Sequence, residues 1–319
     1  MNESRAATPS NTSETVAAPS VSQGIAFLLV AVLGWGLVWP INKVVLESMS
    51  PYWFAAIRSA IGAAALLVIS MPGGRLVLPL RSDMPVLLSI TLLHMVGFAL
   101  LASIGLQLVP VGRSVVLAYT TPLWVMPAAA LFLGERLTLR RAIGVALGLL
   151  GLAVLFNPFA FDWNERTSVI GHATLLLAAF CWAASIVHIR GHTWHSTPFQ
   201  LVPWEALLAT VILFLIAPLA EPWAAVDWNA KLIVLLIASS ILGVAIPYWA
   251  IAMAGRRLSA ITVSQGLLGA PIVGIAVATI ALGEVPDLSV WIALVLVIGG
   301  VALGTMSGRP SRGFSRSAD

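Results

Sequence analysis

The stretch HIRGHTWH holds the clearest candidates for metal ligation. His188, His192 and His195 follow one another at i, i+4 and i+7, a spacing that places them on one face of a helix. Imidazole nitrogens are common ligands of zinc. The stretch lies at the end of an apolar segment with no acid nearby, so we interpret the histidines as a solvated helix face. We predict no metal site.

A second group of residues has the make-up of a small-ligand site. His94 and Phe98 are four residues apart and share one helical face. Apolar walls with a few directional polar groups are typical of a cavity for a small molecule. Helix packing is the alternative for each residue taken singly, but together they favour a cavity. The other members that we predict to line it are Trp35, Trp39, Tyr119, Trp182, Ser185, Tyr248, Trp249 and Gln265.

Arg58 and Glu205 are single charges within the otherwise apolar segments 51–70 and 198–219. A charge in such a segment is costly and needs a partner. The Arg58 side chain could extend to the polar end of its apolar segment, bind backbone carbonyls or bind a substrate carboxylate. Glu205 is the only acid well inside an apolar segment, so it could carry a proton or be a neutral hydrogen-bonded acid. Their expected depths differ by about 10 Å, which leaves a direct ion pair open.

Enzyme motifs are missing from the sequence. It contains no HExxH pair, no G-x-S-x-G nucleophile, no Walker A loop for ATP and no Asp inside an apolar segment. We therefore predict no catalytic residues and no cofactor. An intramembrane enzyme is a distant alternative, and a channel or receptor a further one.

Composition indicates which elements must position these residues. The chain of 319 residues is 59% hydrophobic and 9% charged, with a mean hydropathy of +0.98, whereas about a quarter of a soluble domain is charged. A helix needs roughly 20 apolar residues to cross a membrane. Together with 51–70 and 198–219, the uncharged runs predict ten spans. These runs are 15–42, 84–112, 114–134, 142–161, 167–189, 232–255, 258–283 and 288–308.

The basic residues predict the orientation. With the N-terminus inside, twelve Lys and Arg residues lie on the inner side and four on the outer side, so both termini are expected in the cytoplasm. The basic character then reflects topology and anionic lipid, and we predict no nucleic-acid partner. Arg outnumbers Lys fifteen to two, which is typical of a GC-rich bacterial genome and suggests a bacterial inner membrane.

The chain also contains an internal repeat. PLWVMPAAALFLGE at 122–135 returns as PIVGIAVATIALGE at 271–284, and an offset of 147 relates Trp182 to Trp35. Because each copy holds five predicted spans, the second copy enters the membrane from the opposite side. The predicted fold is an all-α polytopic membrane protein with ten transmembrane helices in two inverted five-helix repeats. We place the repeats at 23–156 and 157–307, and polar tails at 1–22 and 308–319.

The repeated proline interrupts a span in each copy. Pro122 and Pro271 cannot donate to the residue four positions back, so the carbonyls of Ala118 and Leu267 lose their helical partners. Freed backbone at that depth must face protein or a water-filled cavity. We predict a helix kink at each proline, with simple packing as the alternative to ligand contact.

The polar residues after each repeated proline predict helix ends. Gly-Glu closes each span, and we interpret Glu135 and Glu284 as helix-end residues near the head groups. Thr138 and Asp287 fit the N-caps of the helices that follow.

These features resemble a known family. The doubled proline to Gly-Glu unit, LGWGLVWPINK, PYWFAAIRSAIGAA and LLAAFCWAASIVHIR are similar to the EamA branch of the drug/metabolite transporter superfamily over about residues 22–305. The resemblance implies a ten-helix exporter of small metabolites. The aromatic-rich spans look most like the YddG-type bacterial exporters of aromatic and other neutral amino acids.

The function predicted from these observations is export by alternating access, driven without ATP. The expected partners are a small-molecule substrate and the lipid bilayer. The substrate could instead be another small metabolite or a drug-like compound. We favour facilitated over proton-coupled transport, and we leave the oligomeric state open, with a monomer compatible.

Overall fold

The computed structural model describes residues 20–71, 76–156, 161, 163–223 and 226–305, and every regular element within these ranges is a helix. Of the predicted tails, only 20–22 fall in the described ranges, and α1 has begun there. The helices form rods, each of which is either one helix or a series of helices that continue one another. Six of the described rods are single helices: α1 (Val21–Leu46), α2 (Pro51–Ser70), α7 (Leu139–Leu155), α8 (Arg166–Gly191), α9 (Pro198–Ala220) and α14 (Leu288–Thr305).

Other rods are assembled from shorter elements. One comprises η1 (Arg81–Asp83), α3 (Met84–Ser89), η2 (Ile90–Phe98) and α4 (Ala99–Leu108). Another comprises α10 (Ala230–Ser240), η3 (Ile241–Ala245) and α11 (Ile246–Gly255). The last two are α5 (Val111–Ala118) with α6 (Thr121–Leu133), and α12 (Ala260–Leu267) with α13 (Ala270–Leu282).

Nine segments within the described ranges are at least 18 residues long and apolar enough to cross a membrane. They match nine of the ten predicted spans. The remaining one, α7, contains 17 residues, about the lower limit for a crossing. Large apolar side chains point outward from the bundle, such as Ile280, which is 84% exposed, and Leu131, which is 76% exposed. This surface suits lipid.

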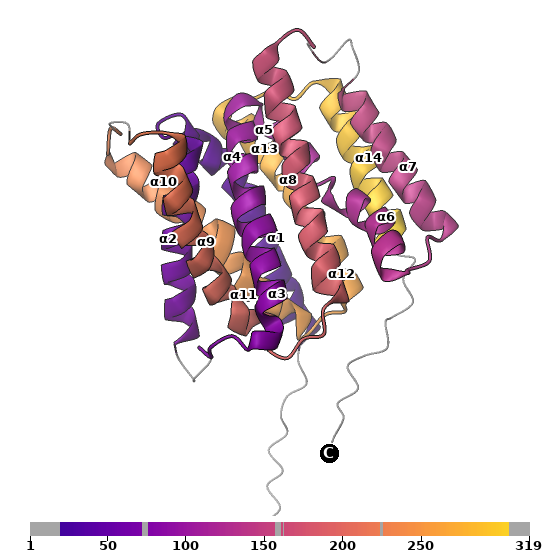
Figure 1. Ribbon diagram of the computed structural model, residues 1–319. Helices are drawn as coiled ribbons and strands as arrows, with labels where there is room; N and C mark the ends of the chain where they lie inside the picture. The colour runs from indigo at the N-terminus through magenta and orange to yellow at the C-terminus, as the bar shows by residue number, and fades with distance from the viewer. Residues whose placement is uncertain (1–19, 72–75, 157–160, 162, 224–225, 306–319) are drawn as a thin grey trace, which may run out of the picture.

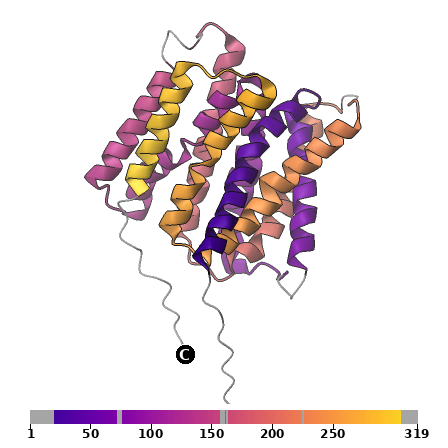
Figure 2. The same cartoon turned by 180° about the vertical axis from the view of Figure 1, so that it is seen from behind.

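Helices far apart in the sequence lie side by side (Figures 1 and 2). Helix α2 packs along α9, α7 packs along α14, α1 packs against α11 and α13, and α8 packs against α4 and α6. Each of these contacts joins an element before residue 157 to one after it. The largest buried apolar cluster lies between these elements, with Val115, Leu123 and Ile275 fully buried in it.

The α7 and α14 helices approach so closely because glycines face each other. A Cβ on Gly144 would clash with the carbonyl oxygen of Gly300, and one on Gly300 would clash with the carbonyl oxygen of Gly144. Small residues at such a crossing allow backbones to touch, which is a common basis of helix association in lipid.

The repeated prolines mark helix breaks rather than kinks within a continuous helix. α5 ends at Ala118 and α6 starts at Thr121, and α12 ends at Leu267 and α13 starts at Ala270. Pro122 and Pro271 occupy the first turn of the new helix, where a missing amide leaves no bond unmade. The carbonyl of Ala118 accepts a hydrogen bond of 2.8 Å from Thr121 Oγ1 and is buried. It is therefore occupied, and we do not retain it as a ligand contact.

The predicted helix caps are confirmed. Gly134 and Gly283 end α6 and α13 in the left-handed region, with φ of 65° and 69°. Thr138 Oγ1 accepts from the Arg141 amide at 3.4 Å at the start of α7. Asp287 Oδ1 accepts from the Val290 amide at 3.0 Å at the start of α14.

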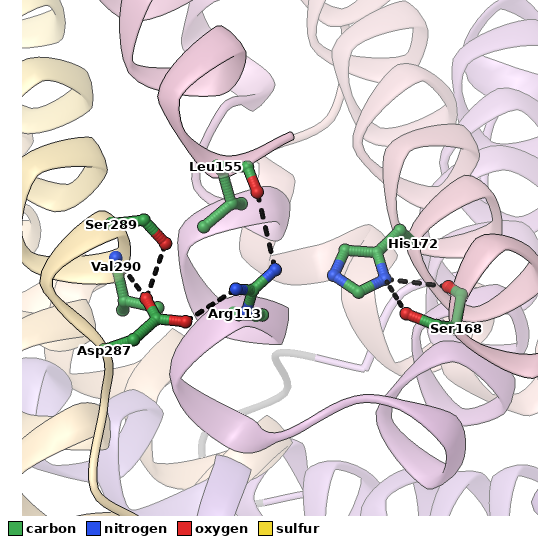
Figure 3. A network of polar contacts seen from close by, with 7 residues as sticks. All are labelled: Arg113, Leu155, Ser168, His172, Asp287, Ser289 and Val290. Carbon is green, nitrogen blue, oxygen red and sulfur yellow. Dashed lines mark hydrogen bonds and ion pairs between the residues drawn. The ribbon is translucent and has the colours of Figure 1, made fainter. Parts of the chain in front are cut away.

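Asp287 also anchors a polar network that joins three helices (Figure 3). Arg113 of α5 donates to Asp287 at 2.6 Å and to the carbonyl of Leu155, the last residue of α7, at 3.4 Å. Burial alone would raise the pKa of Asp287. Hydrogen bonds from Ser289, Arg113 and the Val290 amide together have the larger effect, so the pKa lies below its usual range. The carboxylate is therefore ionised at neutral pH.

The two repeated glutamates connect helix ends to other elements. Glu284 accepts hydrogen bonds from the amides of Val111 at 3.0 Å and Gly112 at 3.4 Å, at the start of α5. Glu135 forms ion pairs with Arg141 at 3.0 Å and Arg190 at 2.5 Å. Both are helix-end residues, as predicted, but each bonds to a specific partner.

Candidate functional site

A cavity of about 1020 Å³, its opening included, lies between elements from both ends of the chain. It is lined by α1, α2, η2 and α4, by the break between α5 and α6, and by α8, α9, η3 and α11. Its lining residues are Trp35, Val38, Trp39, Asn42, Ala55, Arg58, Ser59, His94, Met95, Phe98, Ala99, Ala102, Ser103, Leu106, Tyr119, Trp182, Ala206, Gly243, Val244 and Tyr248.

The structure brings most of the predicted cavity residues to this wall. Seven of the ten line it: Trp35, Trp39, His94, Phe98, Tyr119, Trp182 and Tyr248. Arg58, predicted only as an intramembrane charge, also lines it. Together with Arg58, these residues come from six different rods, which therefore converge on one cavity.

Three predicted members lie elsewhere. The Trp249 ring packs edge-on against Phe27, with centroids 5.3 Å apart, because it is turned about 100° from its neighbour Tyr248 on the helix. Gln265 Nε2 donates to Thr305 Oγ1 and to the Ala302 carbonyl in α14. Ser185 is fully buried away from the cavity. These three residues do not line the cavity.

Aromatic rings form a continuous wall across the two halves of the chain. His94 and Trp182 stack with their centroids 5.1 Å apart and their planes at 2°, and Phe98 contacts the same Trp182 ring at 4.9 Å. Tyr248 Oη lies 3.4 Å from His94 Nδ1, and its ring meets Trp35 edge-on at 6.1 Å. The surface offered to a ligand is apolar and aromatic, with a few polar atoms.

Two π-helical segments face the cavity, and no sequence pattern predicted them. His94 lies in η2 and Gly243 lies in η3. The two positions are separated by 149 residues, the offset of the repeated prolines. π-Helical turns displace backbone hydrogen bonds and occur often at functional sites. The Gly243 carbonyl accepts a hydrogen bond of 3.3 Å from Trp35 Nε1.

Arg58 is the main charged group of the cavity wall. Its Nε donates to Ser239 Oγ at 3.1 Å, and Ser239 donates in turn to Asn42 Oδ1 at 2.5 Å. Its guanidinium also lies against Gly243, where an added Cβ would clash with it. No carboxylate pairs with Arg58 among the residues that the structure describes. The cavity thus holds a cation whose charge no acid in the described part of the chain balances.

Asn42 and Ser239 are site residues that the sequence reasoning missed. Asn42 lies three residues after Trp39 and therefore on the same face of α1, a signal that could have identified it. Ser239 does not line the cavity, but its hydroxyl accepts the hydrogen bond from Arg58 Nε.

Glu205 is separate from Arg58. Its side chain is 2% exposed, and its Oε1 has no hydrogen-bond partner within the described residues. Its neighbour Ala206 lines the cavity, but Glu205 itself does not. No direct ion pair joins the two charges in the described part of the chain.

Lys43 and Gln107 close the end of the bundle beyond Leu106. Lys43 Nζ donates to the carbonyls of Leu106 at 2.8 Å, Gln107 at 3.2 Å and Val109 at 3.1 Å. Gln107 Nε2 donates to the Leu46 carbonyl at 3.1 Å. These bonds join the ends of α1 and α4.

The histidine stretch differs from its prediction. α8 ends at Gly191, so His192 and His195 follow the helix instead of extending the face of His188. An acid is close to both: Asp83, which precedes α3, accepts from His192 Nε2 at 3.0 Å and lies 3.4 Å from His195 Nδ1. Separation of 109 residues along the chain hid this contact from the sequence reasoning.

A family comparison covers most of the chain. One sequence model, that of the EamA-like transporter family, matches residues 22–157 and again 169–306. The chain belongs to the EamA-like transporter family. It is therefore a multi-pass membrane transporter, as its apolar helices indicate.

Relatives of this EamA-like transporter carry transporter names. It is 27% identical over 279 residues to the uncharacterized transporter YvbV of Bacillus subtilis, covering 88% of this chain and 89% of the relative. It is 27% identical over 307 residues to a probable amino-acid metabolite efflux pump of Salmonella typhimurium, covering 92% and 98%. It is 27% identical over 217 residues to a riboflavin transporter of Vibrio cholerae, covering 64% and 68%.

A solved structure shares the fold of this EamA-like transporter. The crystal structure superposes with a TM-score of 0.60 at 22% identity, over 90% of this chain and 98% of the other. At that identity the likeness concerns the fold alone.

Proposed function

We propose that this EamA-like transporter exports small metabolites that bear a carboxylate, in particular aromatic and other neutral amino acids. The observation that carries the proposal is Arg58, a cation on an aromatic cavity wall without an acidic partner among the described residues. An unpaired cation removed from water is unfavourable, and a bound carboxylate would balance it. The efflux pump of Salmonella typhimurium, named for amino-acid metabolites, supports this substrate class.

The cavity offers a partner for each part of such a substrate. Arg58 supplies donors for the carboxylate. The oxygens of Asn42 and Tyr248 can accept hydrogen bonds from an ammonium group. The rings of Phe98 and Trp182 supply the apolar contact for a side chain. With Arg58 bound to the α-carboxylate, the described lining residues offer no second counter-charge for a charged side chain, so Asp, Glu and Lys are expected to be poor substrates.

A planar aromatic heterocycle is a second candidate. The stacked His94 and Trp182 rings present a flat surface, and one relative is named a riboflavin transporter. A ligand of this kind would depend on the stack and not on Arg58.

We further propose alternating access between two inverted repeats, 23–156 and 157–307, each of five spans. The family model matches twice, and the helix contacts support the pairing: α1 meets α13 as α8 meets α6, while α2 meets α9 and α7 meets α14. Transporters with inverted repeats bind substrate between the halves and rock one half against the other. Both termini would lie in the cytoplasm of a bacterium, with the protein in the inner membrane.

Proteoliposome uptake tests the substrate class. The panel is labelled phenylalanine, tryptophan, threonine, lysine, glutamate, riboflavin and phenethylamine, which is phenylalanine without its carboxylate. Phenylalanine and threonine should be transported and phenethylamine should not. Arg58→Gln should abolish the uptake of both amino acids, whereas Arg166→Gln, a change at the exposed start of α8, should retain it. Equal transport of phenethylamine and phenylalanine would exclude carboxylate recognition, and uptake of riboflavin alone would favour the second candidate.

The same vesicles test coupling. We propose facilitated transport, so rates should be equal with and without a pH gradient. Strong acceleration by the gradient, abolished in Glu205→Gln while exchange without a gradient persists, would instead assign proton transfer to Glu205.

A further inference from the structure

We propose that Asp83, His192 and His195 form a binding site for a divalent transition-metal ion of the zinc class. The three residues lie where the rod that starts with η1 meets the connection from α8 to α9. None of them lines the aromatic cavity. Metal binding at this place is therefore separate from substrate binding and can be measured without any substrate.

The ligand atoms already have the spacing of a metal site. His192 Nε2 lies 3.0 Å from Asp83 Oδ1, and His195 Nδ1 lies 3.4 Å from the same oxygen. One ligand atom from each residue lies within 4.8 Å of the others. Around a tetrahedral zinc ion with bonds of about 2.0–2.2 Å, neighbouring nitrogen and oxygen ligands are roughly 3.3 Å apart. Two edges of such a tetrahedron are therefore in place.

Backbone donors hold the carboxylate in position. Asp83 is fully buried. Its Oδ2 accepts from the Ser196 amide at 2.7 Å, and its Oδ1 accepts from the His195 amide at 3.1 Å. An ion would take the place between Oδ1 and the two imidazoles while these amide bonds remain. Such outer hydrogen bonds orient a ligand and strengthen metal binding.

The site is accessible from one side. The side chain of His192 is 12% exposed and that of His195 is 50% exposed. An ion can thus enter past His195, and a water molecule can complete its coordination, as in zinc sites with three protein ligands. Nitrogen and carboxylate donors suit zinc, cobalt and nickel better than calcium or magnesium.

Metal binding would tie together elements that carry cavity residues. The rod that begins at η1 holds His94 and Phe98, and α8 holds Trp182. A ligand that binds only the folded state stabilises it by RT ln(1 + L/Kd), where L is the free ligand concentration. The ion should therefore raise the thermal stability of this part of the transporter as well as bind to it.

The test uses the full chain in detergent, purified without a polyhistidine tag and stripped with a chelator. Zn²⁺ binding is followed by calorimetry and by metal analysis after desalting. Co²⁺ replaces Zn²⁺ for visible absorption, which reports tetrahedral nitrogen and oxygen ligands. His192→Ala, His195→Ala and Asp83→Asn each remove or weaken one ligand. His188→Ala is the matched control, because its ring belongs to the same sequence stretch but not to the cluster.

The expected result for the parent is one ion per chain and a higher Tm with Zn²⁺. In His192→Ala and in His195→Ala, the affinity for Zn²⁺ should be at least roughly tenfold weaker. His188→Ala should bind as the parent does. If Asp83→Asn does not fold, His192→Ala and His195→Ala decide the question, because these two histidines, unlike Asp83, are not fully buried. Absence of saturable binding, or equal affinity in the parent and both histidine variants, would show that the cluster is a hydrogen-bonded contact only.

Discussion

His94 of η2 and Trp182 of α8 stack face to face, with centroids 5.1 Å apart and ring planes at 2°. The first residue belongs to the segment 22–157 matched by the family model and the second to the segment 169–306. This contact crosses between the two segments at the cavity wall. When the two segments move relative to each other, the His94 and Trp182 rings must either move together or separate.

Trp182→Ala should impair the transport of large aromatic substrates more than that of threonine. The lost ring removes apolar contact worth about 25 cal/mol per Å² and the stacking partner of His94, so we expect the KM for phenylalanine and tryptophan to rise about tenfold. Liposome uptake over a range of concentrations measures this effect. Trp249→Ala is the control, because its ring packs on Phe27 outside the cavity. The same loss in both variants, or for every substrate, would contradict the assignment.

Thr121→Val should destabilise the break between α5 and α6. Valine has nearly the same shape but cannot donate to the Ala118 carbonyl, which is fully buried. A buried acceptor left without a partner costs about 1–3 kcal/mol. Thermal unfolding in detergent should show a lower Tm for Thr121→Val and recovery in Thr121→Ser, which restores the hydroxyl. Pro122→Ala should change Tm far less, because Pro122 lies in the first turn of α6. A larger loss in Pro122→Ala than in Thr121→Val would show that the proline holds the break.

Gly300→Ala should separate α14 from α7. The added methyl group meets the backbone of Gly144, which cannot move aside as a side chain can, and overpacking of this kind costs about 1–3 kcal/mol. The neighbouring Gly299→Ala is a matched control, since nothing lies within 4 Å of a Cβ there. Tm should fall in Gly300→Ala and stay level or rise slightly in Gly299→Ala. Equal Tm values in the two variants would mean that the helices are not held at this distance.

Asp287→Asn should lower stability at neutral pH but not in acid. The pKa of Asp287 in the folded protein lies below its ordinary value of 3.8, so the ionised carboxylate stabilises the fold above about pH 4. That contribution is lost as the pH falls through the lower folded pKa. The Tm difference between parent and variant should therefore shrink as the pH drops from 7 towards 3. Asp227→Asn, at an exposed position, should show no such Tm difference. A Tm difference between the parent and Asp287→Asn that widens in acid would contradict the stabilising role of the ionised carboxylate.

Local patterns in the sequence were sufficient for the helices and their ends. Hydropathy predicted the positions of all the long apolar helices, because the need to bury backbone polar groups in lipid leaves little choice but a helix. The caps at Thr138 and Asp287 and the helix ends at Gly134 and Gly283 were also predictable. Their geometry depends only on neighbours within a turn of helix. The repeat offset likewise identified Pro122 and Pro271 as equivalent positions.

The tertiary structure decided which side chains meet. Tyr248 lines the cavity and Trp249 does not, because the rotation of α11 is set by its packing against α1, which periodicity within an apolar helix does not reveal. Asp83 reaches His192 and His195 across 109 and 112 residues of sequence, and Arg58 lines the cavity with no described acid beside it. These relationships arise from the docking of helices far apart in the chain, and no local pattern encodes the distance between their side chains.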